Sequence, residues 1–421
     1  MTGQNPTMVL ARRFDPETVL YYAVALAFLA MSLGTSPMQI SGGLVIAVWL
    51  FSGLAFRNWH IIHSSWLWPI LLLFFLPWFG LIYAPKPNPM GLNFATKTHY
   101  WINSLAMAAL TFKGYKFRPI GYAFLAGVAI NAVLGLCQMA GIVASRGEYF
   151  TGFGRQYNTL SAYLIIAILV GSYYFKTAAS LRPKTIFLAL MGLYFAHLMI
   201  IYGRTGYLAF LLLSPLVVKN LAYRLRMWKV LIICLMLPGL MVLSPVVRHR
   251  AQQTVNELRY HINAGSEKAW GKIYSTHQDR FYMWQGALQI LREHPIMGVG
   301  TGGYQEALKQ RGRVSDPTIS QPHNDILYMA ASYGLLGVLA YTWFYVVLLK
   351  NAWCHRHSDR GSFVLYTVMV LMITGMLNGH LLDAGTVFLL SLVAGLQQGW
   401  AGPPGLRRTV PPFAGNGAYT S

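Results

Sequence analysis

Long apolar runs recur along this chain from end to end, and they constrain its fold more than any other feature. One of them, LWPILLLFFLPWFGLIY, begins at Leu67. Several runs reach about twenty residues, which is the length of helix that crosses ~30 Å of hydrocarbon. Only 11% of the 421 residues are charged, whereas an average soluble domain carries about 25%. These features indicate a polytopic membrane protein.

The fold class follows from the hydrogen bonding of the backbone. Inside a membrane every backbone N–H and C=O must find a partner in the protein, so spanning segments are helices or closed barrels. The apolar runs lack the two-residue alternation of a membrane barrel. We therefore expect an all-α fold with about twelve transmembrane helices, at residues 18–34, 38–56, 66–84, 98–112, 119–143, 158–175, 185–202, 206–218, 228–246, 322–349, 362–378 and 382–400.

Polar residues mark the start of one predicted span and the turn between two others. The span at 98–112 opens with the polar stretch TKTHYW. Residues 185–218 are far too long for one span at ~1.5 Å rise per residue. The chain must therefore turn at YGRTGY, which is the polar point of that run.

The predicted spans divide the chain into four parts. Residues 1–246 carry nine spans, residues 247–321 form a long water-facing segment, and residues 322–400 carry three more spans. The tail 401–421 is rich in Pro and Gly and is predicted to be disordered. Within the long segment, DRFYMWQGALQILREH (279–294) and YQEALKQRGR are expected to form short helices, joined by a Gly-rich turn.

The basic residues predict the orientation in the membrane. The formal net charge is +21, which on a soluble protein would suggest a nucleic-acid partner. Here 18 of the 33 lysines and arginines fall in the short connections of one face and five in those of the other. Short loops rich in Lys and Arg stay in the cytoplasm. We therefore expect both termini inside the cell, residues 247–321 outside it, membrane lipids as neighbours and no nucleic acid.

The stretch QPHNDILYMAASYGLLG, which begins at Gln321, places polar groups at the mouth of an apolar run. Pro322 is typical of the first turn of a helix, so we expect His323 in the positive end of the helix dipole. That environment favours a neutral imidazole, which can take a proton from a hydroxyl group. Asn324 and Asp325 are expected to support it. The alternative is a histidine that only holds the helix start in place.

Two arginines on the predicted outer side are candidates for binding an anion. Arg204 lies in YGRTGY, and Arg280 lies in HQDRFYMW. A guanidinium can form a forked pair of hydrogen bonds with a phosphate group. Both residues also have simpler explanations, because Arg204 could reach lipid head groups and Asp279 could form a plain salt bridge with Arg280.

No motif in the sequence predicts a metal or a cofactor. His60 and His63 have no carboxylate nearby, and His355 and His357 flank a basic loop. The three cysteines form no CxxC pair, and the chain has no Walker A loop. We therefore expect no catalytic metal, no bound cofactor and no direct use of ATP.

Four stretches, in this order along the chain, resemble motifs of the O-antigen ligase and O-antigen polymerase superfamily. They are GEYFTGFGRQYNTLSAYL, which contains Asn158, then YGRTGYLAF, DRFYMWQGALQILREHPIMGVGTGGY and HNDILYMAASYGLLG. The motifs cover residues 147–337, and the number of predicted spans is similar to that of the family. One departure is the Gly before Arg204, where many members have Ser.

The resemblance implies a metal-independent membrane glycosyltransferase of lipopolysaccharide biosynthesis, in the inner membrane of a bacterium with its site facing the periplasm. Such a ligase moves O-antigen from undecaprenyl pyrophosphate to a sugar hydroxyl of lipid A-core. The resemblance also implies that Arg204 and Arg280 bind the pyrophosphate and that His323 is the essential histidine, with Asn158, Asn324 and Asp325 in supporting positions. The compact outer segment before His323 favours a ligase, and a polymerase is the alternative.

Two other classes of function are open at this point. Many transporters have twelve spans, but their ionisable residues lie near the middle of the membrane, where Asp383 and His197 are the main candidates. A scaffolding protein would leave the Gly-rich outer segment and the polar stretch 321–325 unexplained. Polar residues gather on the predicted outer side instead, which favours an enzyme.

Overall fold

The computed structural model describes residues 15–57, 59–86, 88–110, 116–145, 150–154, 156–263, 280–311 and 319–400. Within these ranges the regular secondary structure is entirely helical, and the predicted all-α class is confirmed. The predicted disordered tail, residues 401–421, lies outside the described part of the chain.

Apolar helices with short connections make up the first part of the chain. A helix overlaps each span predicted before residue 246, and the predicted turn at YGRTGY falls between α9 and α10. The bounds are α2 (Pro16–Ala30), α3 (Thr35–Phe51), η1 (Leu54–Phe56), η2 (Trp59–His63), α4 (Leu67–Tyr83), α5 (Pro89–Thr96), η3 (Lys97–Trp101), α6 (Ile102–Ala108), α7 (Arg118–Met139), α8 (Tyr157–Thr177), α9 (Leu181–Ile200), α10 (Arg204–Leu221) and α11 (Met227–Met241).

Three polar helices precede the last apolar helices of the chain. The two that were expected near residues 279–294 and 304–313 are present as α13 and α14. The bounds are α12 (Pro245–Asn263), α13 (Arg280–Glu293), α14 (Gly303–Gln310), α15 (Asp325–Cys354), α16 (Asp359–Gly375), η5 (His380–Leu382) and α17 (Ala384–Gly395).

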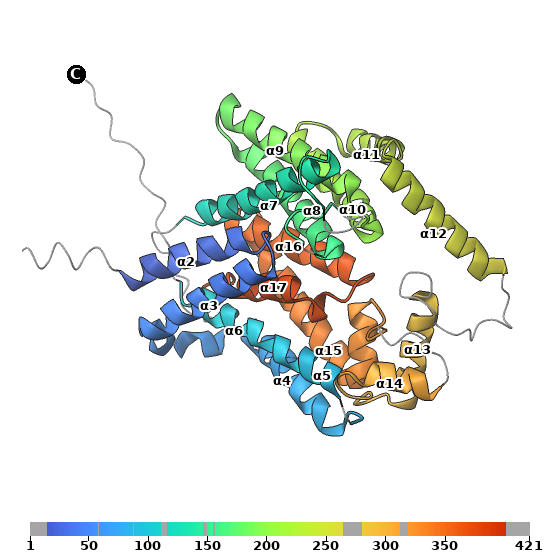
Figure 1. Ribbon diagram of the computed structural model, residues 1–421. Coiled ribbons are helices and arrows are strands. Elements are labelled where there is room, and N and C mark those ends of the chain that lie inside the picture. Colours follow the sequence, from blue (N-terminus) through green and yellow to red (C-terminus); the bar gives the residue numbers. More distant parts are fainter. Residues whose placement is uncertain are drawn as a thin grey trace, which may run out of the picture.

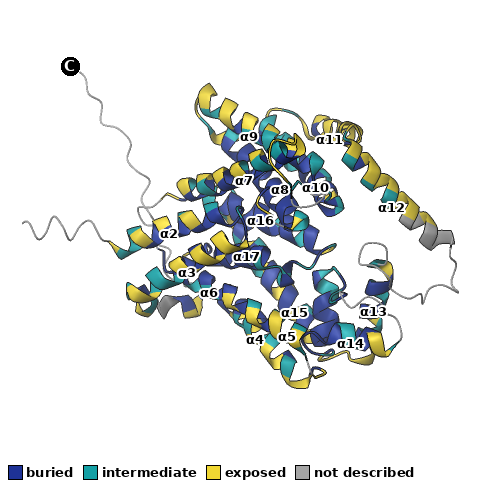
Figure 2. Ribbon diagram, in the orientation of Figure 1, coloured by how far each residue is buried: buried dark blue, intermediate teal, exposed yellow. Residues whose placement is uncertain are grey.

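Helix α8 forms the centre of the bundle. Its residues from Thr159 to Tyr174 are all buried, and α8 packs against α9, α10 and α16. Figure 2 shows this buried centre, with α12 largely exposed at the periphery. Helix α2 begins at the left of the bundle in Figure 1, whereas α12, α13 and α14 lie at its right. The start of α2 and the polar segment therefore lie at opposite ends.

Four helices are long and apolar enough to cross a membrane within the described ranges, namely α7, α8, α9 and α15. The bent pair of α11 and α12 would be a fifth. Shorter helices fill the other predicted spans, and η3 with α6 extends over only roughly 18 Å at ~1.5 Å per residue. Apolar side chains such as Leu235, 80% exposed, cover the outside of the bundle, as expected next to lipid. The protein is a multi-pass membrane protein, while the count of twelve spans stays a prediction.

The predicted Gly-rich turn connects α13 to α14 and docks against α15. Gly298, Gly300 and Gly302 have φ angles of +65°, +82° and +77°, a region that Gly adopts without steric cost. The backbone N–H of Val299 donates a hydrogen bond of 2.9 Å to the carbonyl of Ala331. This turn therefore holds the polar segment against the helix that follows His323.

A glycine in α15 makes this docking possible. Gly334 has φ +60° and ψ −145° and breaks α15 into two helical parts. The N–H of Leu335 donates a hydrogen bond of 2.8 Å to the carbonyl of Pro295 across the break. A Cβ atom on Gly334 would lie 2.4 Å from the carbonyl carbon of Ile296. A side chain at this position would therefore push the turn away from α15.

Helix α12 was missing from the sequence-based prediction, which placed only two short helices in residues 247–321. It begins at Pro245, directly after the apolar α11, and its axis bends away from α11 by 94°. Helix starts favour Pro because its missing N–H would have no helical partner there. The helix continues the chain as a polar arm beside the ends of α9 and α10.

Candidate functional site

The polar stretch before α15 has a different local structure from the predicted one. The helix begins at Asp325, and the Asn324 side chain caps it by accepting a hydrogen bond of 3.0 Å from the N–H of Leu327. The expectation that Pro322 opens the first helical turn was therefore wrong by about one turn. Asn at the N-cap satisfies an N–H of the first turn that has no helical partner, which explains why the helix begins later.

His323 precedes this cap and has an unusual backbone. Its φ angle is +51°, the one positive value among the non-glycine residues of the described ranges. Residues other than Gly adopt this region rarely, and such residues gather at functional sites. The side chain is half-buried. The imidazole therefore leaves the chain just outside the helix, and its surroundings are set by the connecting loop rather than by the first helical turn.

Arg280 and Asn324, the neighbour of His323, are anchored to the same short connection between α16 and α17. Arg280 opens α13, and its Nη1 donates a hydrogen bond of 2.9 Å to the carbonyl of Leu377. The Nδ2 of Asn324 donates one of 2.8 Å to the carbonyl of Met376. Trp284, one turn along α13, donates from Nε1 to the carbonyl of Pro322 at 3.0 Å. The structure thus brings one predicted arginine into the neighbourhood of the predicted histidine.

Arg204 lies at a second group of helix starts, together with Asn158. It opens α10, and its Nη1 donates a hydrogen bond of 3.2 Å to Oγ1 of Thr254 on α12. Gly203 approaches α8 so closely that a Cβ would lie 2.4 Å from Oγ of Ser161 and 3.7 Å from the carbonyl of Tyr157. Asn158 occupies the first turn of the same α8. The small residues around Arg204 therefore allow α8 and α10 to start side by side.

A polar cavity of about 570 Å³ has lining residues that precede both groups in the sequence. Gly154 and Gln156 come shortly before Asn158, and Ser320 and Gln321 come shortly before His323. Its size falls within the ~300–1,000 Å³ of typical ligand sites. We call it the polar cavity, lined by Thr35, Gln39, Asn93, Phe94, Thr96, Lys97, His99, Tyr100, Gly154, Gln156, Ser320, Gln321, Gly379, Leu382, Asp383 and Ala384. Neither Arg204 nor Arg280 lines the polar cavity. Binding of one pyrophosphate by both arginines therefore stays a prediction.

Lys97 and Asp383 are the charged residues of the polar cavity, and the sequence analysis gave neither of them a role in the site. The Lys97 ammonium donates a hydrogen bond of 2.9 Å to the carbonyl of Leu382. Burial lowers the pKa of Lys97, and the negative charge of Asp383 opposes this effect. Asp383 caps α17, and its Oδ1 accepts a hydrogen bond of 3.0 Å from the N–H of Thr386. The signal for Lys97 was the polar stretch TKTHYW at the start of a predicted apolar span.

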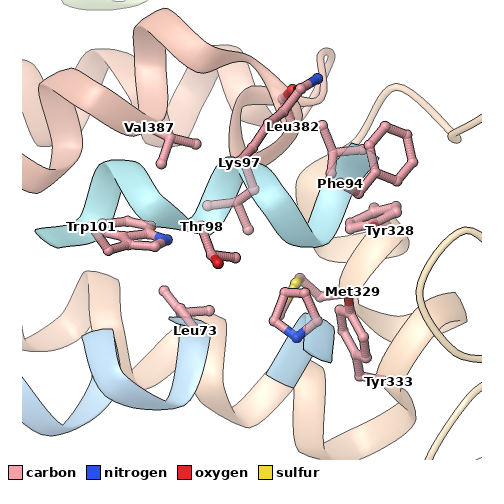
Figure 3. A pocket seen from close by; sticks show the side chains of 12 residues that line it. Leu73, Phe94, Lys97, Thr98, Trp101, Tyr328, Met329, Tyr333, Leu382 and Val387 are labelled. Carbon is pink, nitrogen blue, oxygen red and sulfur yellow. The ribbon is translucent and has the colours of Figure 1, made fainter. Parts of the chain in front are cut away.

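A small apolar pocket underlies this part of the polar cavity. Figure 3 shows its lining, in which Phe94 and Tyr328 lie next to each other and the Lys97 side chain extends toward Leu382. The ring centroids of Phe94 and Tyr328 are 6.1 Å apart, with the rings at 89°. The apolar contacts hold the stem of Lys97, so its ammonium is positioned at the boundary with the polar cavity.

Asp325 is fully buried and acts as an anchor for the chain between α16 and α17. Its Oδ1 accepts a hydrogen bond of 3.0 Å from the N–H of Leu381. A Cβ on Gly375 would lie 2.6 Å from Oδ2. Nearby, Nε2 of His380 lies 2.6 Å from Oγ1 of Thr374. Asp325 therefore supports the connection that also receives Arg280 and Asn324.

His197 and Asp383, the two residues that would favour a transporter, both have structural partners. Nε2 of His197 lies 2.8 Å from the carbonyl of Phe150, and Asp383 caps a helix at the polar cavity. The described ranges contain no group of three or more His, Cys, Asp or Glu side chains that could hold a metal ion. The expected independence from metals stays a prediction.

Residues 186–342 match a protein-family model described as O-antigen ligase. This region runs from α9 to the kinked α15, so it contains Arg204, Arg280 and His323 and confirms the resemblance seen in the motifs. No curated protein sequence matches the chain.

Proposed function

We propose that the protein transfers O-antigen from undecaprenyl pyrophosphate to a sugar hydroxyl of lipid A-core, because residues 186–342 match a family model described as O-antigen ligase. The family implies a membrane glycosyltransferase that acts on lipid-linked glycans. We assign the reaction to the outer side of the bacterial inner membrane, with both termini in the cytoplasm. The polymerase reaction differs only in its acceptor, which would be another lipid-linked glycan.

The proposed reaction exchanges a glycosyl–pyrophosphate bond for a glycosidic bond. The acceptor hydroxyl oxygen attacks the anomeric carbon of the donor sugar, and the bond from that carbon to the pyrophosphate oxygen breaks. His323 takes the hydroxyl proton as general base. The undecaprenyl pyrophosphate leaves with the bonding electron pair, and the guanidiniums of Arg204 and Arg280 stabilise the charge that develops on its oxygens.

The anchoring of Arg280 and Asn324 to neighbouring carbonyls is the observation that supports this assignment best. The hydrogen bonds to Leu377 and Met376 hold a cation and the residue beside the candidate base on one connection. The polar cavity is lined by Gln321 and Gln156, which come two residues before His323 and Asn158 in the sequence. A hydroxyl-rich substrate in that cavity would have a base and a cation close by.

Analysis of lipopolysaccharide from a deletion strain tests the proposal. Core without O-chain indicates a ligase, and core that carries a single repeat unit indicates a polymerase. Unchanged lipopolysaccharide would contradict both. A purified protein that forms the glycan–lipid product from donor and acceptor in detergent would establish the activity directly, and complementation with the wild-type chain is the control.

A further inference from the structure

The lining of the polar cavity bears on how the substrate is bound. We infer that Lys97 and Asp383 form a subsite for an uncharged sugar ring, which is separate from the pyrophosphate site proposed for the arginines. This inference rests on the proposed function and deepens it. It follows from the charge, the side-chain chemistry and the position of the cavity.

The charge of the lining favours a neutral ligand. Lys97 and Asp383 contribute opposite charges to the polar cavity, whereas a pyrophosphate site needs an excess of positive charge. The ammonium has three donors and the carboxylate has about four acceptor sites. Leu382 uses one of the donors, and Thr386 uses Oδ1 of Asp383. The pair can therefore offer both a donor and an acceptor to sugar hydroxyls.

The remaining lining suits a carbohydrate. Gln39, Asn93 and Gln156 provide amide groups, which can both donate and accept hydrogen bonds. The rings of His99 and Tyr100 are tilted by 38° with their centroids 4.0 Å apart, and Nε2 of Gln39 donates a hydrogen bond of 3.0 Å to the Tyr100 hydroxyl. A cavity with many hydrogen-bonding groups and a few aromatic surfaces can hold the polar and apolar faces of a sugar.

The position of the cavity admits two sources for this sugar. Gln321 connects it to His323, which is where an acceptor hydroxyl would react. Gln156 connects it to the start of α8, near the turn with Arg204, where the donor pyrophosphate would bind. The acceptor saccharide and the first sugar of the donor share the same chemistry, and an experiment can separate them.

Sugar binding can be measured without any transfer reaction. The probes are lipid-free core oligosaccharide and, separately, a lipid-free O-antigen repeat unit, each observed by saturation-transfer NMR with the full-length protein in detergent. The variants are Asp383→Asn, in which Asn still caps α17 because Asn and Asp are equally good N-caps, and Lys97→Met, which keeps an apolar stem. Matched controls are Glu306→Gln and Lys86→Met, which remove the same charges from another cavity, of about 540 Å³.

We expect one of the two probes to bind the wild-type protein and to bind each cavity variant about tenfold more weakly, because each variant loses a hydrogen bond between a charged group and a sugar hydroxyl. The two controls should bind like the wild type. Equal binding to all five proteins, or no binding of either probe to the wild type while it still makes product, overturns the subsite. Binding that depends on Asp383 in a protein that makes no glycan product would refute the proposed function and leave the subsite standing.

Transfer kinetics then identify the source of the sugar. If the subsite holds the acceptor, Asp383→Asn raises KM for the acceptor about tenfold and leaves KM for the donor unchanged. If it holds the first donor sugar, the two effects are exchanged. A loss of kcat with both KM values unchanged contradicts a binding role for this residue.

Discussion

The guanidinium of Arg280 donates a hydrogen bond of 2.9 Å to the carbonyl oxygen of Leu377, 97 residues further along the chain. This contact joins the start of α13 to the connection between α16 and α17. The same connection receives the Asn324 side chain and leads directly to Asp383. The candidate cation, the candidate base and the polar cavity therefore depend on one stretch of backbone.

Replacing Arg280 with lysine should reduce transfer although the positive charge is retained. An ammonium cannot form the forked contact that a guanidinium makes with a phosphate group. We expect kcat/KM for the donor to fall about tenfold or more, in line with ~1.5–3 kcal/mol for charged hydrogen bonds. Arg311→Lys is the control, since Arg311 pairs with Glu293 on α13. Unchanged kcat/KM in Arg280→Lys would remove this arginine from the proposed site.

His323 can be tested with substitutions that suit its backbone. Asn tolerates positive φ better than most residues, so His323→Asn should preserve the loop while removing the base, and His323→Gln keeps a hydrogen-bonding side chain. Because general-base catalysis contributes ~10²–10⁴-fold, both variants should bind donor normally and form only trace product. Near-normal transfer by the Gln variant would show that His323 orients substrate or holds structure instead.

The contact between Arg204 and Thr254 predicts that α12 helps to position this arginine. Thr254→Val keeps the shape of the side chain but removes the hydroxyl that Arg204 contacts. We expect a fall in kcat/KM of roughly tenfold, because a hydrogen bond to a charged group contributes ~1.5–3 kcal/mol. Thr254→Ser, which retains the hydroxyl, should behave like the wild type. If Val and Ser variants transfer equally well, α12 has no part in placing Arg204.

Asp325 is expected to contribute to stability rather than to proton transfer. In Asp325→Ala the part-buried N–H of Leu381 loses its acceptor, which should cost ~1–3 kcal/mol and lower the melting temperature in detergent. Asp325→Asn keeps an oxygen at that position and should melt closer to the wild type. An Asn variant with wild-type melting but only trace transfer would instead identify Asp325 as a base.

Sugar binding in the polar cavity should depend on pH through Lys97. Its pKa is lowered by burial, with Asp383 as the opposing charge, and the ammonium is present only below that pKa. Oligosaccharide binding should therefore weaken as the pH rises, beginning below the ordinary range of lysine. Lys97→Arg stays protonated at these pH values and should bind independently of pH. Identical pH profiles for the two proteins would exclude Lys97 as the titrating group.

The sequence by itself determined the class of the fold and several of its helices. Hydrophobic runs and the need to satisfy the backbone in lipid lead to helices, and all regular structure in the described ranges is helical. Local patterns also predicted α13, α14, the turn at Arg204 and the Gly-rich turn. Four motifs predicted the family that residues 186–342 match.

The tertiary structure alone decided how the site is assembled. The length of each helix depends on where it is capped and where it breaks. In α15 these positions are the N-cap Asn324 and the break at Gly334. A hydropathy pattern does not show such positions. The grouping of Arg280 with Asn324, and the placing of Lys97 beside Asp383, join residues far apart in sequence through contacts with backbone carbonyls. Every residue offers such carbonyls, so the order of side chains along the chain gives no sign of which ones will be used.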